Sequence, residues 1–398
     1  PQRVCWAGRR EIMREGSSFA APHIAGLVAL VRQALPDALT KMVRTVLAAN
    51  ALPGGPVRRS GKVVVTSVPG WMRRVALYPF NKEIHALVRF RDLLPFEVVG
   101  IADPIGKGLV GKDAAQAIGE EPMGMVISAR VEVATRNADT LILGYVDQLG
   151  RVAKKDLLRA CIEKALDRKL HVFSFAPVWP EQYSDLHQRA KELGLHLAYP
   201  HIENREVLAI LKKGPEGNPV SAPVLGVFGT SSSQGKFTVQ LILRRKLAAL
   251  GLKIGQLGTE PHAELFGMDG SFPMGYASPL QIPLQHYPAY LDAKLRAIDK
   301  EPRDIILTGS QSGTIPYDMY NPRTYAMGSL AFLLGTRPDA CVLVVNSIDA
   351  DDYIQDTLDA LRCIGKTRVL ALAMSDKEKH PRQVMGRVLH LPRQLNAE

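Results

Sequence analysis

The feature that most constrains the fold of this chain is a short stretch at residues 223–238, which reads PVLGVFGTSSSQGKFT. An apolar run at 224–228 predicts a buried strand, and the small polar residues that lead to Gly235 and Lys236 predict a tight turn. A helical pattern of apolar residues then covers 238–250. Backbone N–H groups of such a turn and of the helix N-terminus point at one spot, where Lys236 adds a full positive charge. The order of strand, turn and helix therefore predicts a phosphate-binding loop.

The strict phosphate-loop pattern, GxxxxGK[ST], is not met by this stretch. Counting back from Gly235 places Thr230 where the first glycine belongs, and Phe237 takes the Ser/Thr position. The spacing GTxxxxGK from Gly229, with Thr238 one place late, resembles the variant of dethiobiotin-synthetase-like P-loop proteins. A serine-rich connector between a strand and a helix is the alternative. The candidate cofactor-binding residues of the loop are Gly229, Thr230, Ser231, Ser232, Ser233, Gln234, Gly235, Lys236, Phe237 and Thr238.

The composition is that of an ordinary globular chain. Its 398 residues suffice for about two or three domains, with 46% hydrophobic and 22% charged residues. No apolar run approaches the roughly 20 residues that span a bilayer, so we expect a cytoplasmic protein without a membrane partner. The net charge of +11 is carried by basic pairs spread along the chain. Such a surface attracts anions in general, including nucleotides and acyl-CoA, or is simply solvated, and we expect no nucleic-acid partner.

Cysteines and the first residue bear on the compartment and on the chain start. The four cysteines show no CxxC pair and no zinc spacing with histidine, so we interpret them as thiols in a reducing compartment. The sequence opens on Pro1 with no Met, and we expect the true N-terminus to lie outside it.

The first informative stretch of the chain is EGSSFAAPHIAGLVALV at residues 15–31. It resembles the serine-nucleophile motif of the subtilisin-like proteases, GTSxAxPHxAG, and the resemblance makes Ser18 the catalytic nucleophile position. In that family Asp, His and the oxyanion Asn all precede the serine, whereas only 17 residues precede Ser18 here and none is His or Asn. A serine without a base is not activated. We therefore expect residues 1–60 to be the helical C-terminal fragment of a protease domain, inactive as it stands.

Residues 71–213 alternate between strand and helix patterns, which predicts a Rossmann-like, open parallel sheet with helices on both faces. The first strand runs into Pro79-Phe80-Asn81, where a dinucleotide-binding fold carries GxGxxG, so NAD binding at this turn is disfavoured. The lysine-containing turns near Lys107 and Lys112 are interpreted as surface loops. Weaker site candidates follow the predicted strands at Asp103, Asp147, Tyr199 and His201. The predicted strands are 75–78, 96–102, 140–144, 171–175 and 195–199, and the predicted helices are 82–93, 153–168 and 180–193.

Residues 220–377 form a second predicted α/β domain, the P-loop domain, after a linker at 214–219. A Gly-rich excursion from Gly258 to Pro283 is too long for a simple connector, so we expect it to be functional. The predicted strands are 224–228, 253–257, 304–307, 341–346 and 368–373, and the predicted helices are 238–250, 291–300, 324–334 and 353–363. The whole chain is thus expected to be α/β, with a protease remnant at its start.

From about Arg74 to Lys377 the chain resembles a two-domain family of P-loop proteins that includes a D-glutamate N-acetyltransferase. The resemblance rests on the loop at 229–238 and on four further matches, at Phe96-Glu97-Val98-Val99, Gly255-Gln256, Gly309–Ser312 and Pro338-Asp339-Ala340. It adds Gly309 and Gln311 to the candidate cofactor-binding residues.

The same resemblance raises the question of a metal. Enzymes of this kind have an acidic residue that helps to hold Mg²⁺ where this chain has Thr308, which leaves nucleotide hydrolysis open because the metal needs hard oxygen ligands. The candidate metal ligands are Thr238 and Glu260, with Asp269 as a substitute. The acidic group Asp349, Asp351 and Asp352 is interpreted as a helix N-terminal cap and solvated face.

These observations lead to one expected function and two alternatives. We expect a transferase-like P-loop enzyme, similar to an N-acyltransferase, that acts as a homo-oligomer on a small amino-acid or peptide substrate. Its cofactor is expected to be ATP with Mg²⁺ or acetyl-CoA. One alternative is a subtilisin-like serine endopeptidase (a hydrolase) with an accessory nucleotide-binding domain, and the other is a non-catalytic binding module.

Overall fold

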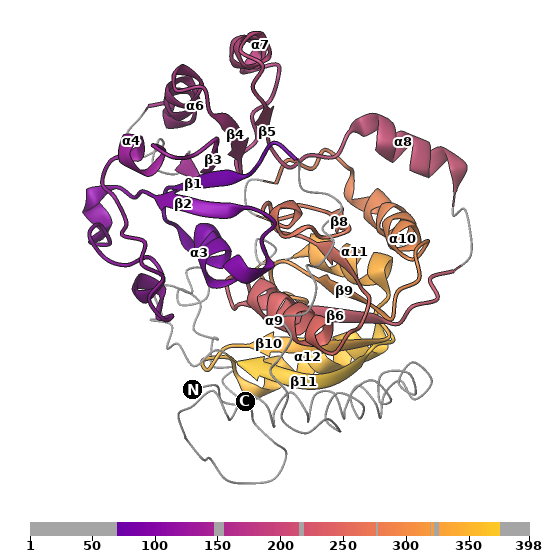
Figure 1. Ribbon diagram of the computed structural model, residues 1–398. Helices are drawn as coiled ribbons and strands as arrows, with labels where there is room; N and C mark the ends of the chain where they lie inside the picture. Colours follow the sequence, from indigo (N-terminus) through magenta and orange to yellow (C-terminus); the bar gives the residue numbers. More distant parts are fainter. Residues whose placement is uncertain are drawn as a thin grey trace. The chain divides into compact units, whose positions relative to one another are not determined.

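The computed structural model describes residues 70–146, 155–214, 219–275, 278–318, 320–321 and 326–374 (Figure 1). The predictions for residues 1–60, including Ser18, and for Asp147 lie outside the described residues. Within the described part, strands alternate with helices along the chain and form two parallel sheets. This arrangement confirms the predicted α/β fold class. No helix of that part is long and apolar enough to cross a membrane.

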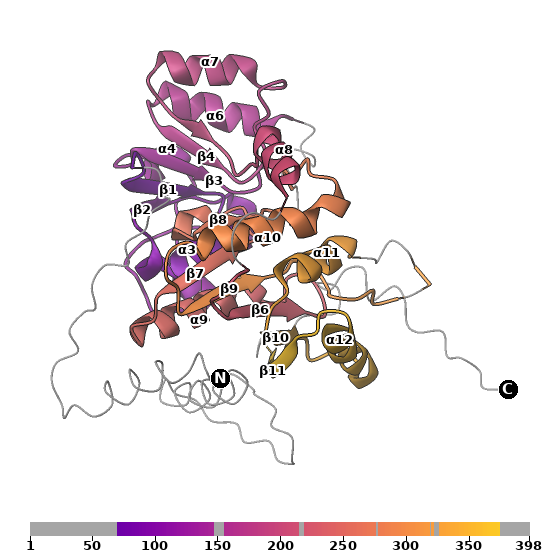
Figure 2. The same ribbon diagram turned by 90° about the vertical axis from the view of Figure 1, so that its right-hand side faces the viewer.

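The first sheet has five parallel strands in the order β2-β1-β3-β4-β5. All four residues of β3 are buried, as expected for an interior strand that is covered on both faces. Helix α3 (Lys82–Arg89) lies on one face, and α4 (Val131–Ala134), α6 (Leu157–Asp167) and α7 (Ser184–Glu192) lie on the other (Figures 1 and 2). The strands are β1 (Arg74–Tyr78), β2 (Glu97–Ile101), β3 (Thr140–Leu143), β4 (His171–Ser174) and β5 (Leu197–Ala198).

Two helix predictions of this region differ from the structure. The predicted helix 82–93 ends as α3 at Arg89, because the buried Phe90 leaves the helical backbone and a 3-10 turn, η2 (Arg91–Leu93), follows. Helix α8 (Asn204–Lys213) was not predicted. Only Val207 of its ten residues is buried, although its sequence has apolar residues at helical spacing between Val207 and Leu211.

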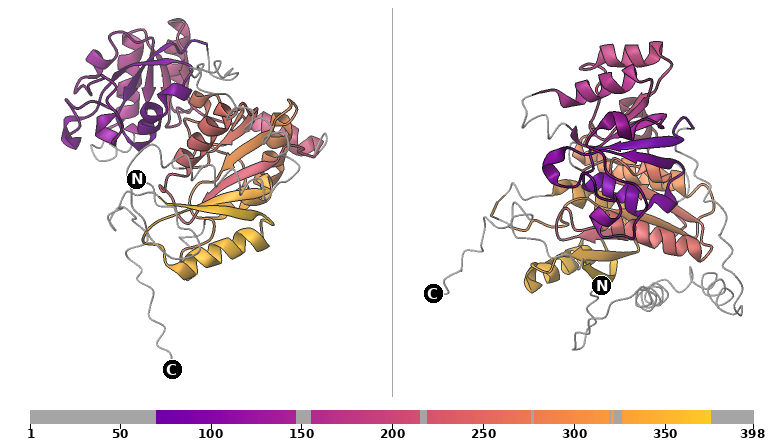
Figure 3. Two further views of the ribbon diagram at one scale, coloured as in Figure 1. Left: turned by 60° about the horizontal axis from the view of Figure 1, so that its bottom comes forward. Right: turned by 60° about the vertical axis from the view of Figure 1, so that its left-hand side comes forward.

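The second sheet has six strands in the order β11-β10-β6-β9-β7-β8. Its strand β6 (Val224–Gly229) is buried along its whole length. Helix α9 (Lys236–Ala249) covers one face, and α10 (Tyr287–Ile298) and α11 (Met327–Thr336) lie on the other (Figure 2). Helix α12 (Asp351–Cys363) runs beside β11 (Figure 3). The other strands are β7 (Ile254–Gly258), β8 (Gly270–Ser271), β9 (Ile305–Gly309), β10 (Ala340–Val345) and β11 (Arg368–Met374).

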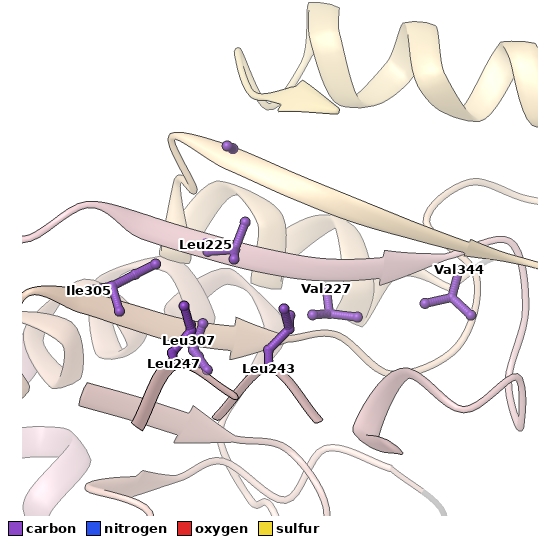
Figure 4. Packing of buried hydrophobic residues seen from close by; sticks show 8 residues of the cluster. Leu225, Val227, Leu243, Leu247, Ile305, Leu307 and Val344 are labelled. Atoms are coloured by element: carbon purple, nitrogen blue, oxygen red, sulfur yellow. The ribbon is translucent and has the colours of Figure 1, made fainter. Parts of the chain in front are cut away.

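An apolar cluster fixes α9 on the strands of this sheet. Each fully buried Leu, Ile or Val side chain stabilises the fold by roughly 1.5–3 kcal/mol, so the helix is held firmly. The turn between β6 and α9 therefore begins and ends on anchored elements. The members of the cluster that Figure 4 labels are Leu225, Val227, Leu243, Leu247, Ile305, Leu307 and Val344.

The described chain divides into two compact units. One contains Asn204–Leu257 and the chain from Ile282, and the other contains the chain up to Glu203 together with Gly258–Gln281. The long excursion after β7 thus packs within the unit of the first sheet. There the ring of His262 stacks on Phe175 with 5.3 Å between centroids, and burial lowers the pKa of His262 to about 3.

Candidate phosphate-binding site

Two glycines shape the turn between β6 and α9. A Cβ on Gly229 would lie 2.7 Å from Gln234 Oε1 and 3.2 Å from the carbonyl oxygen of Val344, so a side chain here would require Gln234 and the neighbouring backbone to shift. Gly235 has a φ of +95°, a left-handed conformation that glycine adopts without strain, and α9 begins at the next residue. The predicted order of strand, turn and helix is therefore present.

The turn that leads into α9 presents backbone amides without a protein acceptor in the described part of the chain. Its N-cap residue, Gly235, makes no side-chain hydrogen bond to the first turn. In the part of the chain that the structure describes, the amides of Ser232, Gln234 and Gly235 have no acceptor. The exception is the amide of Ser231, which donates to Gln234 Oε1 at 2.9 Å. Uncapped amides at the positive end of a helix dipole form a site for an anion.

Lys236 turns back over this loop. Its side chain is 6% exposed, and Nζ donates a hydrogen bond to the carbonyl oxygen of Ser231 at 2.6 Å. Its Cδ would lie 3.0 Å from a Cβ on Gly229, so the side chain crosses the end of the strand. A phosphate bound at the loop would compete with the Ser231 oxygen for this ammonium group.

A buried polar network holds the base of the loop. The hydroxyl of Thr230 donates to Asp349 Oδ2, and that oxygen also accepts the amide of Asn346 at 2.8 Å. Tyr353 donates its hydroxyl to the Thr230 carbonyl oxygen at 2.8 Å, and Asn346 Nδ2 donates to Ser231 Oγ at 3.0 Å. The loop is thus tied to the turn after β10 and to α12.

This network corrects the interpretation of Asp349 as a helix cap. The N-cap of α12 is Ala350, which makes no side-chain hydrogen bond to the helix, and within the first turn Asp352 Oδ1 accepts the amide of Tyr353 at 2.7 Å. Asp349 is 9% exposed, whereas Asp351 and Asp352 are exposed, as predicted for a solvated face. The signal that was missed is the polar pair Asn346 and Asp349 at the carboxyl end of β10, a strand that pairs with β6.

The segment after β9 supports the loop from the other side. Thr314 donates both its amide and its hydroxyl to the carbonyl oxygen of Gly229, at 2.8 and 3.0 Å. Gly309 faces α9, where a Cβ on it would lie 1.9 Å from Gln240 Nε2. The carbonyl oxygen of Gln311 accepts the hydroxyl of Ser329, which ties this residue to α11. The sequence identified Gly309 and Gln311, but not Thr314 or Gln240.

The remaining residues that were predicted to bind a cofactor or a metal are Phe237, Thr238 and Glu260. Phe237 packs its side chain into the interior at 8% exposure. Thr238 is partly exposed on the first turn of α9, and its Cβ would lie 3.9 Å from a Cβ on Gly235. Glu260 belongs to the unit of the first sheet. No cluster of three or more His, Cys, Asp or Glu side chains suited to a metal occurs among the described residues.

The site candidates of the first sheet are engaged in internal contacts. Asp103 is fully buried, and its Oδ1 accepts the amide of Phe80 at 2.9 Å and Lys107 Nζ at 3.0 Å. Burial raises the pKa of Asp103, while Lys107 opposes that shift. A hydrogen bond of 3.0 Å joins His201 Nδ1 and the carbonyl oxygen of Tyr199. Lys107 therefore forms an ion pair with a buried carboxylate of the protein itself.

The fold and the loop together define an α/β protein with a P-loop in its second sheet. Residues 211–389 match the model of the DUF1611 family, described as a P-loop domain of unknown function, and residues 5–71 match the model of the Subtilase family. The chain therefore carries a P-loop domain and a subtilase fragment.

Solved structures support the fold. A crystal structure of a DUF1611 family protein from Anabaena variabilis is similar with a TM-score of 0.55 at 15% identity, and the match covers 77% of this chain and 89% of that one. The chimerical protein CapA2B2 matches 42% of this chain and 79% of its own at 14% identity, and its TM-score of 0.26 supports no argument. No curated protein matches this chain.

Proposed function

We propose that the loop from Gly229 to Thr238 binds the phosphate groups of a nucleotide or of acyl-CoA. On this proposal the protein is a transferase-like enzyme that acts on a small amino-acid or peptide substrate. The observation that carries the proposal is the uncapped start of α9 with the buried Lys236 turned over it. The resemblance to a family that includes a D-glutamate N-acetyltransferase supports the substrate class.

The chemistry that these residues supply is anchoring and charge neutralisation. The amides of Ser232, Gln234 and Gly235 donate to phosphate oxygens, and Lys236 leaves the Ser231 carbonyl oxygen for one of them. Amides that are fixed before binding need no reorganisation when the ligand arrives. With a nucleotide the loop would neutralise charge on its phosphates, and with acyl-CoA it would hold the cofactor while the acyl group is passed to an amine.

The test is a calorimetric titration of the full chain with ATP, GTP and acetyl-CoA, repeated on Lys236→Ala. We expect this variant to weaken binding of the preferred ligand by about 10- to 100-fold, because a charge-assisted hydrogen bond contributes roughly 1.5–3 kcal/mol. Lys246→Ala is the matched control, since Lys246 is exposed in the last turn of the same helix. Unchanged affinity in Lys236→Ala would count against the proposal.

The Subtilase match favours a second candidate, a serine endopeptidase with an accessory nucleotide-binding domain. Ser18 would be its nucleophile, and an Asp and a His would have to come from outside this sequence. The discriminating observation is the reading frame upstream of Pro1. A histidine motif of the HGT type and a preceding Asp, with peptide hydrolysis that Ser18→Ala abolishes, would support this candidate.

A further inference from the structure

The carboxyl end of β9 is the place where a P-loop enzyme would hold its metal. Strand β9 pairs directly with β6, with Val227 opposite Gly309, so its last residues lie beside the start of the loop. In P-loop NTPases, Mg²⁺ is held by a loop Ser/Thr and by an Asp from outside the loop. At the end of β9 this chain has Thr308 and Gly309, neither of which can supply a carboxylate.

The side chain of Gln240 fills the space at this strand end. It lies four residues after Lys236 on α9, and so on the same face of the helix. A Cβ on Gly309 would lie 1.9 Å from Gln240 Nε2 and 2.3 Å from its Cδ. A carboxylate at position 309 would therefore require Gln240 to move, and a neutral amide occupies the place beside the glycine.

The buried polar atoms around this strand end carry no charge. Gln240 is 1% exposed, and its Oε1 has no hydrogen-bond partner among the described residues. The same holds there for the hydroxyls of Thr308 and Ser310, which are 0% and 1% exposed. Magnesium prefers carboxylate and phosphate oxygens, so a set of neutral donors is a poor match for it.

The carboxylate that contacts the loop is already engaged. Asp349 Oδ2 accepts the Thr230 hydroxyl and the Asn346 amide at the base of the loop. The donor set of the loop and of the neighbouring strand end therefore does not fit a tightly held divalent cation. Positive charge comes instead from Lys236 and from the N-terminal end of α9.

We infer that this loop binds its phosphorylated ligand without a divalent cation. We also infer that the Gln240 side chain occupies the space at the end of β9 where a metal-binding carboxylate would lie. The inference rests on the proposed function, because it concerns the same loop. It narrows the ligand to a metal-free phosphate ester or anhydride rather than the Mg²⁺ complex of one.

The experiment titrates the full chain with ATP and with acetyl-CoA, once in EDTA and once in excess Mg²⁺. We expect each probe that binds to do so in EDTA at least as tightly as in Mg²⁺, within about threefold. Binding of ATP that is more than threefold tighter in Mg²⁺ would overturn the inference and leave the proposed function standing. If no phosphorylated probe binds in either buffer, the proposed function falls and the inference falls with it.

The variant Gln240→Glu tests the role of this side chain. A carboxylate so close to the start of the loop should weaken ATP binding about tenfold in EDTA, and Mg²⁺ should restore part of that loss. Gln355→Glu is the control, because it makes the same charge change at an exposed position of α12. If Gln240→Glu binds ATP with the affinity of the parent chain in both buffers, the Gln240 side chain does not decide whether the site holds a metal. The comparison of the two buffers on the parent chain is decisive even where this variant folds poorly.

Discussion

Two strand-to-helix turns of the protein can be compared, β1 to α3 and β6 to α9, and we propose that only the second binds an anion. In the first, the side chain of Asn81 caps α3 by accepting an amide of its first turn at 3.2 Å. Asp103 accepts the neighbouring amide of Phe80 at 2.9 Å. In the second, Gly235 caps nothing, and Lys236 brings an ammonium group over the loop.

The difference between the two turns lies in side chains rather than in backbone architecture. At the first turn the ammonium of Lys107 is already paired with the carboxylate of Asp103 at 3.0 Å, and the amides of Phe80 and Ile84 are already bonded. Asn81 is also packed on Gly144, where a Cβ would lie 2.7 Å from its Nδ2, so little space is left. The comparison teaches that a side-chain cap uses the same first-turn amides that an anion would need, so the two turns differ in the amides they leave available.

The largest effect is expected when a carboxylate is introduced into the turn between β6 and α9, as Asp103 supplies one at the turn between β1 and α3. Ser232 is exposed and its amide is uncapped within the described chain, so Ser232→Asp should fold normally and place a carboxylate among the loop amides. We expect ATP or acetyl-CoA affinity to fall roughly 100-fold, as measured by calorimetric titration. Ser232→Asn is the neutral control of equal size. Equal losses in both variants would mean that bulk and not charge closes the site.

A smaller effect is expected when the support of the loop is removed. Asp349→Ala deletes the acceptor of the Thr230 hydroxyl and of the Asn346 amide, so we expect a loss of about 2–3 kcal/mol in the free energy of unfolding. Thermal unfolding measures it, with Asp356→Ala on the exposed side of α12 as control. A stability equal to that of the parent chain would show that this network does not hold the loop.

The smallest effect concerns the capped turn. Asn81→Ala removes the side-chain cap of α3 and should cost about 1 kcal/mol of stability, seen as a lower thermal unfolding midpoint. Affinity for the phosphorylated probes should not change, because Asn81 takes no part in the loop after β6. Weaker probe binding in this variant would break the contrast between the two turns.

Most of the fold was predictable because its elements follow local patterns. Strands such as β3 and β6 are continuous apolar runs, and the helices between them show apolar residues at helical spacing. Helix α9 was predicted from Thr238 and begins at Lys236, since its first turn is the polar end of the loop. Helix α8 was missed although its sequence has apolar residues at helical spacing between Val207 and Leu211.

The supports of the loop could not be predicted in the same way. Tyr353 and Thr314 bond the loop from 123 and 85 residues away along the chain, and nothing in their own neighbourhoods marks them as partners of Thr230 and Gly229. Asp349 looked like a helix cap because acidic residues before a helix usually are caps. Its partner, 119 residues distant, was visible only once β10 lay beside β6.

The sequence by itself determined where most of the strands and helices and the loop lie, because apolar spacing, glycine positions and Lys236 act over a few neighbouring residues. Tertiary structure alone decided which side chains hold the loop and which one fills the end of β9. Gln240 reads as one polar residue in a helix, yet its position against Gly309 depends on how α9 packs on the sheet. Contacts between distant segments arise from packing, and no local pattern encodes them.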